Sequence, residues 1–271
     1  MHESSQEKMD DVGNMEAAAR DTALNARDFA TQHTLQFIGS VTGRSNLRIL
    51  EVGCGEGHLA KALVDQGHLV LPIDVSEEAV ASARSLGLSA KQTDIFGIKD
   101  SVFDCILFTR SLHHINPLVE SLAQAALLLD KGGFVLLEEF VFNKWDEKTA
   151  VWFQGVRNIV FATGIKGFER SDLGIAFAHL MKHYTEHHLH TGDQLIQAFR
   201  DIFAKVEIFE GVPCIYRYFV PGTEPEAHGY ELIKAIFDWE LLQIEKGFIQ
   251  GLGFRAIGSS PEARYRIANS R

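Results

Sequence analysis

Apolar and polar positions along the chain alternate between two periods. Short runs rich in Val, Ile, Leu and Phe, typical of buried strands, occur at 47–52, 69–75, 89–95, 103–109 and 133–142. Between them, segments with apolar residues at helical spacing occur at 15–40, 57–66, 77–86 and 117–129, and Ser76 is placed to cap the third. Strands that alternate with helices predict an α/β fold with a parallel sheet and helices on both faces.

The alternation breaks after residue 142. Residues 143–190 are rich in aromatic and histidine side chains, so we expect a cap inserted after the fifth strand. Thr191 and Gln194 then match a capping box, which predicts a helix over 194–203. Three further elements are predicted, two antiparallel strands and one helix, at 205–210, 214–220 and 230–246. The tail after residue 250 is less regular.

Composition and charge restrict the partners. The chain has 271 residues, with 26 Lys and Arg against 36 Asp and Glu, so its formal net charge is −10. This balance argues against nucleic acid and anionic membranes, because both attract clustered cations. Three scattered cysteines and a polar N-terminus predict a cytoplasmic protein without a signal peptide. No apolar run reaches the roughly 20 residues of a membrane span.

The most informative stretch is a buried strand followed by alternate glycines, Glu51-Val52-Gly53-Cys54-Gly55-Glu56-Gly57. Glycines let the backbone turn tightly and approach a ligand, and the next helix presents free N–H groups. A dinucleotide fingerprint needs Gly-x-Gly-x-x-Gly, whereas the third glycine here comes one position early. The spacing behind an acidic residue instead resembles motif I of the class I S-adenosylmethionine-dependent methyltransferases.

Later motifs extend this resemblance to the small-molecule (UbiE-like, type 11) branch of that family. Asp74 ends the second strand, Asp94 ends the third, and the fourth leads into Thr109-Arg110-Ser111-Leu112-His113-His114. The resemblance implies S-adenosylmethionine as cofactor, with Asp74 at the ribose hydroxyls and Asp94 at the adenine amino group. It assigns cofactor contacts to Glu51, Gly53, Cys54, Gly55, Gly57, Asp74, Val75, Asp94, Ile95 and Thr109.

The resemblance also implies the architecture of the whole chain. We expect a Rossmann-like sheet of seven strands, mostly parallel with the last strand antiparallel, and a helical cap after strand five. Five parts are expected in order: an N-terminal leader and helix (1–40), the S-adenosylmethionine-binding core (41–142), the cap (143–190), the end of the core sheet (191–221) and a C-terminal helical extension (222–271).

Histidines near the expected methyl position are the candidates for catalysis. The loop after the fourth strand lacks the Asn/Asp-Pro-Pro-Tyr/Phe signature of amino methyltransferases that act on adenine, which favours a small-molecule acceptor. His114 is a candidate base, as are His188 and His190, because many members of the resembled family carry a substrate-facing histidine shortly before the penultimate helix. Side chains expected to contact the acceptor are His113, Glu139, Trp152 and Tyr184.

Several local alternatives remain open. His179, His183 and His187 recur every four residues, so they are surface or structural histidines, a substrate-facing base, or zinc ligands on one helix face. One histidine of the pair at 113–114, for which we favour His113, is expected to hydrogen-bond the loop backbone. Of the two glutamates at 138–139, we expect one to face the cleft and the other to be solvated.

The main prediction is an enzyme that transfers a methyl group to an O, C or N atom of a small molecule. Two other functions fit the same sequence less well. One is a non-catalytic cofactor-binding subunit that acts through a protein partner. The other is a dinucleotide-dependent oxidoreductase, against which the early third glycine argues. The apolar stripe of the final predicted helix indicates a packed element or the interface of a homodimer.

Overall fold

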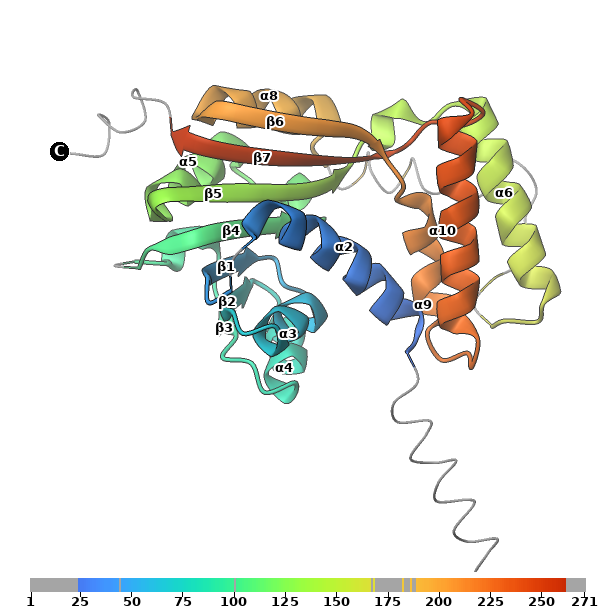
Figure 1. Ribbon diagram of the computed structural model, residues 1–271, viewed down its shortest axis with the longest axis horizontal. Helices are drawn as coiled ribbons and strands as arrows, with labels where there is room; N and C mark the ends of the chain where they lie inside the picture. The colour runs from blue at the N-terminus through green and yellow to red at the C-terminus, as the bar shows by residue number, and fades with distance from the viewer. Residues whose placement is uncertain are drawn as a thin grey trace, which may run out of the picture.

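The computed structural model describes residues 24–43, 45–99, 101–166, 168, 182, 186 and 189–261. Within these residues, a seven-stranded sheet has the order β3-β2-β1-β4-β5-β7-β6 (Figure 1). The strands are β1 (Arg48–Val52), β2 (Leu69–Asp74), β3 (Lys91–Gln92), β4 (Phe103–Thr109), β5 (Leu129–Phe140), β6 (Phe203–Val212) and β7 (Gly253–Pro261). Neighbouring strands pair in parallel except at β7, which is antiparallel to β5 and β6. The predicted sheet, mostly parallel with its last strand antiparallel, is confirmed.

Helices cover both faces of this sheet, as predicted. Helices α2 (Ala26–Thr42) and α3 (His58–Asp65) share one core with strand residues that include Ile49, Leu107 and Leu136. Helices α5 (Leu118–Leu128) and α8 (Gly192–Ile202) share another core with the alternate residues of the same strands, among them Leu50, Ile106 and Val135. Because successive strand residues point to opposite faces, these strands are apolar throughout and buried on both sides.

Local sequence signals explain where several helices begin. The Ser76 hydroxyl caps α4 (Glu77–Ser85), and Thr191 forms the predicted capping box with Gln194 at the start of α8. Asn25 forms a second capping box at the start of α2, which we did not predict. The helix therefore begins at Ala26 rather than at residue 15 as predicted, and residues 15–23 lie outside the described residues.

The end of the sheet differs from the prediction. The segment predicted as a strand at 214–220 instead contains a 3-10 helix, η4 (Ile215–Phe219), whose start is fixed by Glu240. The Glu240 carboxylate accepts hydrogen bonds from three consecutive backbone N–H groups, at 2.7 to 2.9 Å. The seventh strand is β7, from the tail that we assigned to a helical extension. The predictions that the core sheet ends by residue 221 and that 222–271 is a helical extension are therefore wrong.

Glycines conceal β7 in the sequence because they are poor strand formers. A Cβ atom added to Gly258 would lie 2.7 Å from the Phe199 ring of α8, and one added to Gly253 would lie 2.6 Å from the Val212 carbonyl oxygen. Both glycines therefore allow a close approach that a larger residue would block. The tail looks irregular as a sequence, although its packing against α8 and β6 is tight.

A layer of helices stands beyond one end of the sheet (Figure 1). Helix α6 (Glu147–Ala162) follows β5, where the cap was predicted, whereas α9 (Val220–Thr223) and α10 (Gly229–Glu245) lie between β6 and β7. Trp152 of α6 meets Trp239 of α10 edge to face, with ring centroids 5.4 Å apart. Two separate insertions therefore build this layer. None of the described helices is long and apolar enough to cross a membrane.

Candidate active site

Two cavities open at the carboxyl ends of the parallel strands. The first has a volume of about 380 Å³ and lies between the glycine-rich turn, α2 and the η4–α9 segment. The second, of about 500 Å³, lies over the ends of β2 and β4 and the loops that follow β3 and β4. Gly53, Gly55 and Arg110 line both cavities and so mark their junction. Ligands of parallel α/β sheets bind at this edge.

The predicted cofactor residues all line one or both of these cavities. Those confined to the first cavity are Glu51, Cys54, Gly57 and Thr109. Those confined to the second are Asp74, Val75, Asp94 and Ile95. The structure thus brings together residues that are up to 58 positions apart in the chain, from Glu51 to Thr109.

The glycine-rich turn needs its glycines for backbone conformation and for space. Gly53, Gly55 and Gly57 have φ values of +73°, +54° and +85°, in the left-handed region that favours glycine. A Cβ atom on Gly53 would lie 2.5 Å from Cβ of Ser111, and one on Gly57 would lie 2.7 Å from Cβ of Ala83. At Gly55 the space is open, with no atom within 4 Å of an added Cβ. The turn therefore presents bare backbone to both cavities.

Glu51 is a buried acid with an incomplete set of contacts. It lies near the end of β1, just before the glycine-rich turn, and is 1% exposed. Its Oε2 atom has no hydrogen-bond partner among the described residues. Burial raises the pKa of its carboxyl group to about 8, against the opposing effect of the Arg110 charge. Such a group favours a cationic or hydrogen-bond-donating ligand in the first cavity.

Asp74 is held in position by the backbone around it. Its Oδ2 atom accepts a hydrogen bond from the Gly55 N–H, and its Oδ1 atom accepts one from the Ser76 N–H, both at 2.9 Å. Each carboxylate oxygen can accept a further hydrogen bond, so the group suits a pair of hydroxyls in the second cavity. Asp94 is exposed, and its Oδ1 accepts a hydrogen bond from the Gly97 N–H at 3.0 Å.

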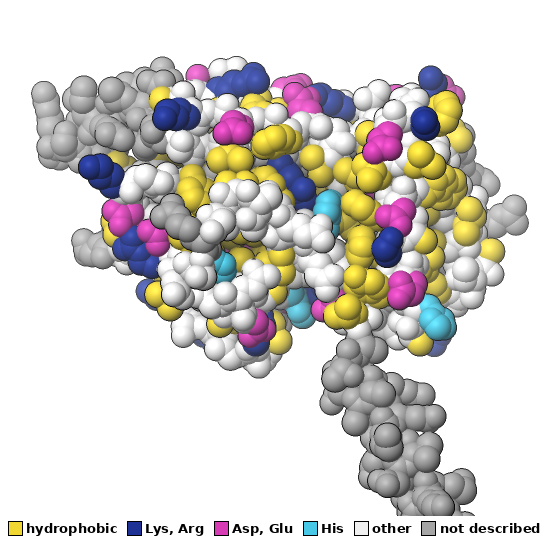
Figure 2. Space-filling view, viewed as in Figure 1, with side chains coloured by type: hydrophobic (Ala, Val, Ile, Leu, Met, Phe, Trp, Pro, Cys, Tyr) yellow, Lys and Arg dark blue, Asp and Glu magenta, His cyan; other side chains and the backbone are white. Residues whose placement is uncertain are grey.

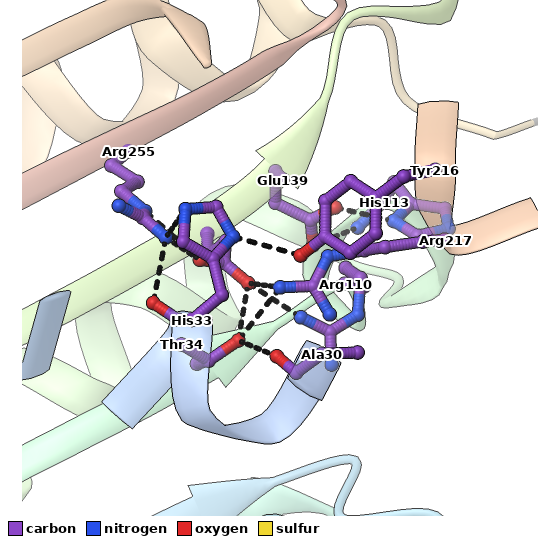
Figure 3. Close-up of polar contacts among 10 residues, drawn as sticks. Ala30, His33, Thr34, Arg110, His113, Glu139, Tyr216, Arg217 and Arg255 are labelled. Atoms are coloured by element: carbon purple, nitrogen blue, oxygen red, sulfur yellow. Dashed lines mark hydrogen bonds and ion pairs between the residues drawn. The ribbon is translucent and has the colours of Figure 1, made fainter. Parts of the chain in front are cut away.

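Glu138, near the end of β5, is buried and accepts hydrogen bonds from three arginines, which Figure 3 labels. Arg110 and Arg217 donate to its Oε1 at 2.6 and 3.0 Å, and Arg255 donates twice to its Oε2, at 2.9 and 2.7 Å. Burial opposes ionisation of Glu138, but the charges of Arg217, Arg110 and Arg255 outweigh it and hold its pKa well below the usual range. We call these four residues the arginine cluster.

Two polar neighbours of the arginine cluster are neutral. Nδ1 of His33 lies 2.8 Å from the Tyr216 hydroxyl, and the Arg255 guanidinium lies 3.3 Å from Nε2 of His33 (Figure 3). Burial, together with the charge of Arg255, lowers the pKa of His33 to about 3. Burial raises the pKa of the Tyr216 hydroxyl above its usual range. Neither group supplies a negative charge to the arginines at neutral pH.

Glu139 contacts the loop after β4 from outside the two cavities. Its Oε2 atom lies 2.6 Å from Nδ1 of His113, and its Oε1 atom accepts a hydrogen bond from the Leu112 N–H at 2.6 Å. Both side chains are buried, and neither lines the two cavities. His113 and Glu139, which we expected to contact the acceptor, therefore lie outside both cavities and contact the loop instead. The expectation that one of the glutamates at 138–139 is solvated is wrong, since they are 6% and 1% exposed.

The candidate bases lie in different settings. His114 lines the second cavity, and its ring centroid lies 4.2 Å from that of His113. His190 supports the same loop: its Nε2 donates to the Ile115 carbonyl oxygen at 3.1 Å, and its backbone N–H donates to the His113 carbonyl oxygen at 3.0 Å. His188 lies outside the described residues. Of the candidate bases in the described part of the chain, His114 alone lines a cavity.

The predicted acceptor contacts in the cap are not brought to the cavities. Trp152 is buried against Trp239 in the helical layer and lines neither cavity. Tyr184 lies outside the described residues, as do His179, His183 and His187, so the three interpretations of the histidine repeat remain predictions.

Arg110 and Arg217 both line the first cavity, although the sequence motifs predict no role for either. Arg110 follows β4 directly and has a φ of +59°, which is rare for a residue other than glycine. A cation at the end of the fourth strand is a signal that could have been used. Arg217 lay in a segment that we predicted as a strand and Arg255 in the irregular tail, so folding alone brings them to Glu138.

Comparisons with known proteins show what this chain is similar to. A family model described as a methyltransferase domain matches residues 23–202. The chain is 32% identical over 130 residues to an uncharacterized methyltransferase of Schizosaccharomyces pombe, which covers 44% of this chain and 49% of that protein. It is 36% identical over 108 residues to a ubiquinone biosynthesis O-methyltransferase of Xylella fastidiosa, covering 36% and 44% of the two chains. The matches span about half the length of these curated relatives.

Solved structures share the fold over most of the chain. The plantazolicin methyltransferase BpumL, in complex with a triazolic desmethylPZN analog and SAH, has a TM-score of 0.51 and 15% identity, and the match covers 92% of this chain and 90% of that chain. Another structure of BpumL, in complex with SAH, has a TM-score of 0.51 and 16% identity, covering 86% and 84% of the two chains. At this level of identity, the similarity concerns the fold.

Proposed function

Because this chain belongs to the methyltransferase-domain family, we propose that it is an S-adenosylmethionine-dependent methyltransferase that acts on a small-molecule acceptor. The observation that carries the proposal is the meeting of two cavities at Gly53, Gly55 and Arg110, above the carboxyl ends of the strands. The second cavity offers hydrogen-bond acceptors for a nucleoside, and the first offers a buried carboxyl group whose Oε2 atom has no partner among the described residues. Together they suit a ligand with a nucleoside part and an amino-acid part.

The residues present fit S-adenosylmethionine. The unpartnered Oε2 atom of Glu51 suits the amino group of the methionine part. Asp74 suits the two ribose hydroxyls, because each of its oxygens can accept one more hydrogen bond. Asp94 and Ile95 line the same cavity and suit the adenine amino group and ring. The bare backbone at Gly55 leaves room for the ligand to pass between the cavities.

S-adenosylmethionine supplies a methyl group on a sulfonium centre, which is already electrophilic. The chain must therefore align the acceptor and exclude water. The helical layer of α6, α9 and α10 is placed to do this, and we propose that these two insertions, with the rest of 143–190, determine which acceptor enters. If the acceptor must lose a proton, we assign the base to His114, with His188 and His190 as alternatives.

The location and the partners of the enzyme belong to the same proposal. We propose a cytoplasmic enzyme that acts on a free small molecule rather than on nucleic acid or at a membrane, in keeping with its net charge of −10. Large apolar side chains are exposed on α6 and α10, among them Val151, Ile159, Trp239 and Leu242, and Figure 2 shows hydrophobic side chains gathered over this region. We propose that a homodimer covers them, which light scattering across a concentration series tests.

The activity is tested by incubating the purified chain with S-adenosylmethionine labelled in its methyl group and a metabolite extract. A labelled small molecule formed by this chain alone supports the proposal and excludes a non-catalytic subunit. If the chain binds SAH but transfers no labelled methyl group to any component of the extract, the non-catalytic subunit is favoured instead. Binding of a nicotinamide dinucleotide in place of SAH favours the oxidoreductase. Mass spectrometry of the labelled product identifies the acceptor and the methylated atom.

A further inference from the structure

We propose that Arg110 and Arg217 bind a carboxylate group of the methyl acceptor in the first cavity. This inference rests on the proposed methyltransferase function and adds to it the chemical class of the substrate. It is carried by the charge balance of the arginine cluster, by the direction in which two of its arginines face, and by three apolar residues beside them.

The arginine cluster contains more positive than negative charge. Three guanidinium groups share the single carboxylate of Glu138, which leaves a formal charge of +2. The other buried acids nearby form no ion pair with the three arginines: Glu139 contacts His113 and the Leu112 N–H, and Glu240 accepts hydrogen bonds from three backbone N–H groups at the start of η4. Their charges act on Arg110 and Arg217 from a distance and offset the excess only in part. Since buried charges in proteins are normally paired, this excess calls for a further anion.

The other charged groups at the first cavity do not supply that anion. The Arg27 guanidinium donates hydrogen bonds to both carboxylate oxygens of Glu224, at 2.6 and 2.7 Å, and also forms an ion pair with Glu56. Glu51 lines the same cavity, but no hydrogen bond joins it to Arg110 or Arg217 among the described residues. The unbalanced cations of this cavity are therefore the two arginines of the cluster that line it.

Arg110 and Arg217 reach the cavity from opposite elements and keep donors for a ligand. Arg110 follows β4 and donates to Glu138 through Nη1 alone, while Arg217 of η4 donates to Glu138 and Thr34 through Nη2 alone. Figure 3 shows both guanidinium groups on the same side of Thr34. The remaining N–H groups of each arginine have no hydrogen-bond partner among the described residues. They suit a planar carboxylate, which guanidinium groups bind in pairs of hydrogen bonds.

Part of the first cavity's wall is apolar, although most of its lining residues are polar. Ala30 of α2 and Val220 and Pro221 of α9 line it beside Arg217. Such a site fits a carboxylate carried by an apolar body, rather than a small inorganic anion. Because Arg110 lines both cavities, a carboxylate held there lies at their junction, next to the glycine-rich turn.

A carboxylate at these arginines has two sources, the acceptor or the methionine part of the cofactor. The probe for the acceptor is benzoate, titrated into the protein saturated with SAH, with neutral benzamide of the same shape as control. We expect benzoate to bind the SAH complex at least tenfold more tightly than benzamide. The Arg217→Gln variant should lose this preference and bind SAH within about threefold of the original chain.

Arg255→Gln is the matched control. This substitution also removes one positively charged partner of Glu138. Because Arg255 lines neither cavity, the preference for benzoate should persist. Thermal unfolding checks that each variant is folded. If Arg217→Gln does not fold, Arg110→Gln takes its place, and loss of the preference there supports the proposal.

Three results overturn the inference while leaving the methyltransferase proposal intact. The first is equal binding of benzoate and benzamide to the SAH complex. The second is a preference that persists when both Arg110 and Arg217 are replaced one at a time. The third is a loss of SAH affinity of tenfold or more in Arg217→Gln when the SAH complex of the original chain shows no preference for benzoate, which assigns the arginines to the cofactor's own carboxylate. Failure of the original chain to bind SAH at all instead contradicts the proposed function.

Discussion

Oε2 of Glu139 lies 2.6 Å from Nδ1 of His113, and both side chains are buried. This contact ties the end of β5 to the loop that follows β4, its parallel neighbour in the sheet. The same loop carries Arg110 and His114, which line the cavities. A buried pair outside the cavities therefore determines where the residues inside them lie.

Replacing Glu139 should loosen this loop and weaken the fold. Glu139→Ala leaves His113 and the Leu112 N–H without their buried partner, so the free energy of unfolding should fall by about 3 kcal/mol. Chemical denaturation measures the change. Glu207→Ala, at an exposed position of β6, is the control and should change stability by less than about 0.5 kcal/mol. Equal effects of the two substitutions would contradict the positioning role.

Asp74→Ala should weaken cofactor binding, because the ribose hydroxyls lose their acceptor. A charged hydrogen-bond partner contributes about 1.5–3 kcal/mol, so the dissociation constant for SAH should rise roughly 10- to 100-fold. Calorimetry measures it directly. Glu78→Ala removes an exposed carboxylate of α4, four residues further along, and should leave the affinity unchanged. Unaltered SAH affinity in Asp74→Ala would remove this residue from the site.

The parts of the fold that the sequence predicts well are those specified by local contacts. The turn at Gly53, Gly55 and Gly57 is one example, since its left-handed backbone requires glycine and its neighbours in sequence supply the strand and the helix. The caps at Ser76 and Thr191 are others, because a capping side chain bonds to backbone a few residues away. The position of Asp74 follows from the end of β2, which is itself locally recognisable. The predicted strand over 89–95 is wrong in its extent, because β3 is only Lys91–Gln92 and Asp94 lies two residues beyond it, where it caps a 3-10 helix.

The parts that the sequence does not reveal depend on contacts between distant segments. Strand β7 is stabilised by pairing with β5 and β6 rather than by its own composition, and Gly258 is needed against Phe199 of α8. The arginine cluster joins residues 110, 138, 217 and 255, from four separate elements. No spacing rule links such positions, because only the three-dimensional pairing of the strands brings them together.

His114→Ala should lower turnover more than it lowers cofactor affinity. A general base contributes about 10²- to 10⁴-fold when the acceptor must lose a proton, so turnover of the first identified acceptor should fall within that range. SAH affinity, measured by calorimetry, should stay within about threefold. His188→Ala, assayed in parallel, distinguishes the alternative base. Normal turnover in both variants would show that neither histidine acts as the base.

His33 should make stability fall on acidification. Its pKa is lowered to about 3 in the folded chain, so below pH 6.5 the unfolded chain takes up a proton that the folded chain does not. The resulting loss is about 1.4 kcal/mol per pH unit between pH 6.5 and 3. His33→Gln should flatten the pH dependence of the free energy of unfolding in this window. His228→Gln, at an exposed position, is the control and should not flatten it.

Binding of SAH should release a proton from Glu51. Burial raises the pKa of its carboxyl group to about 8, so at pH 7 it is mostly protonated before the ligand binds. An ammonium group beside it favours the charged form and lowers this pKa, which releases about one proton per SAH bound at pH 7. Calorimetry in phosphate and in Tris measures the release, because the two buffers differ in their heat of ionisation. Glu51→Gln should abolish it. Glu56→Gln should not, because the charge of Arg27 lowers the pKa of Glu56 and keeps it ionised before binding. If the original chain releases no proton, Glu51 does not receive the amino group.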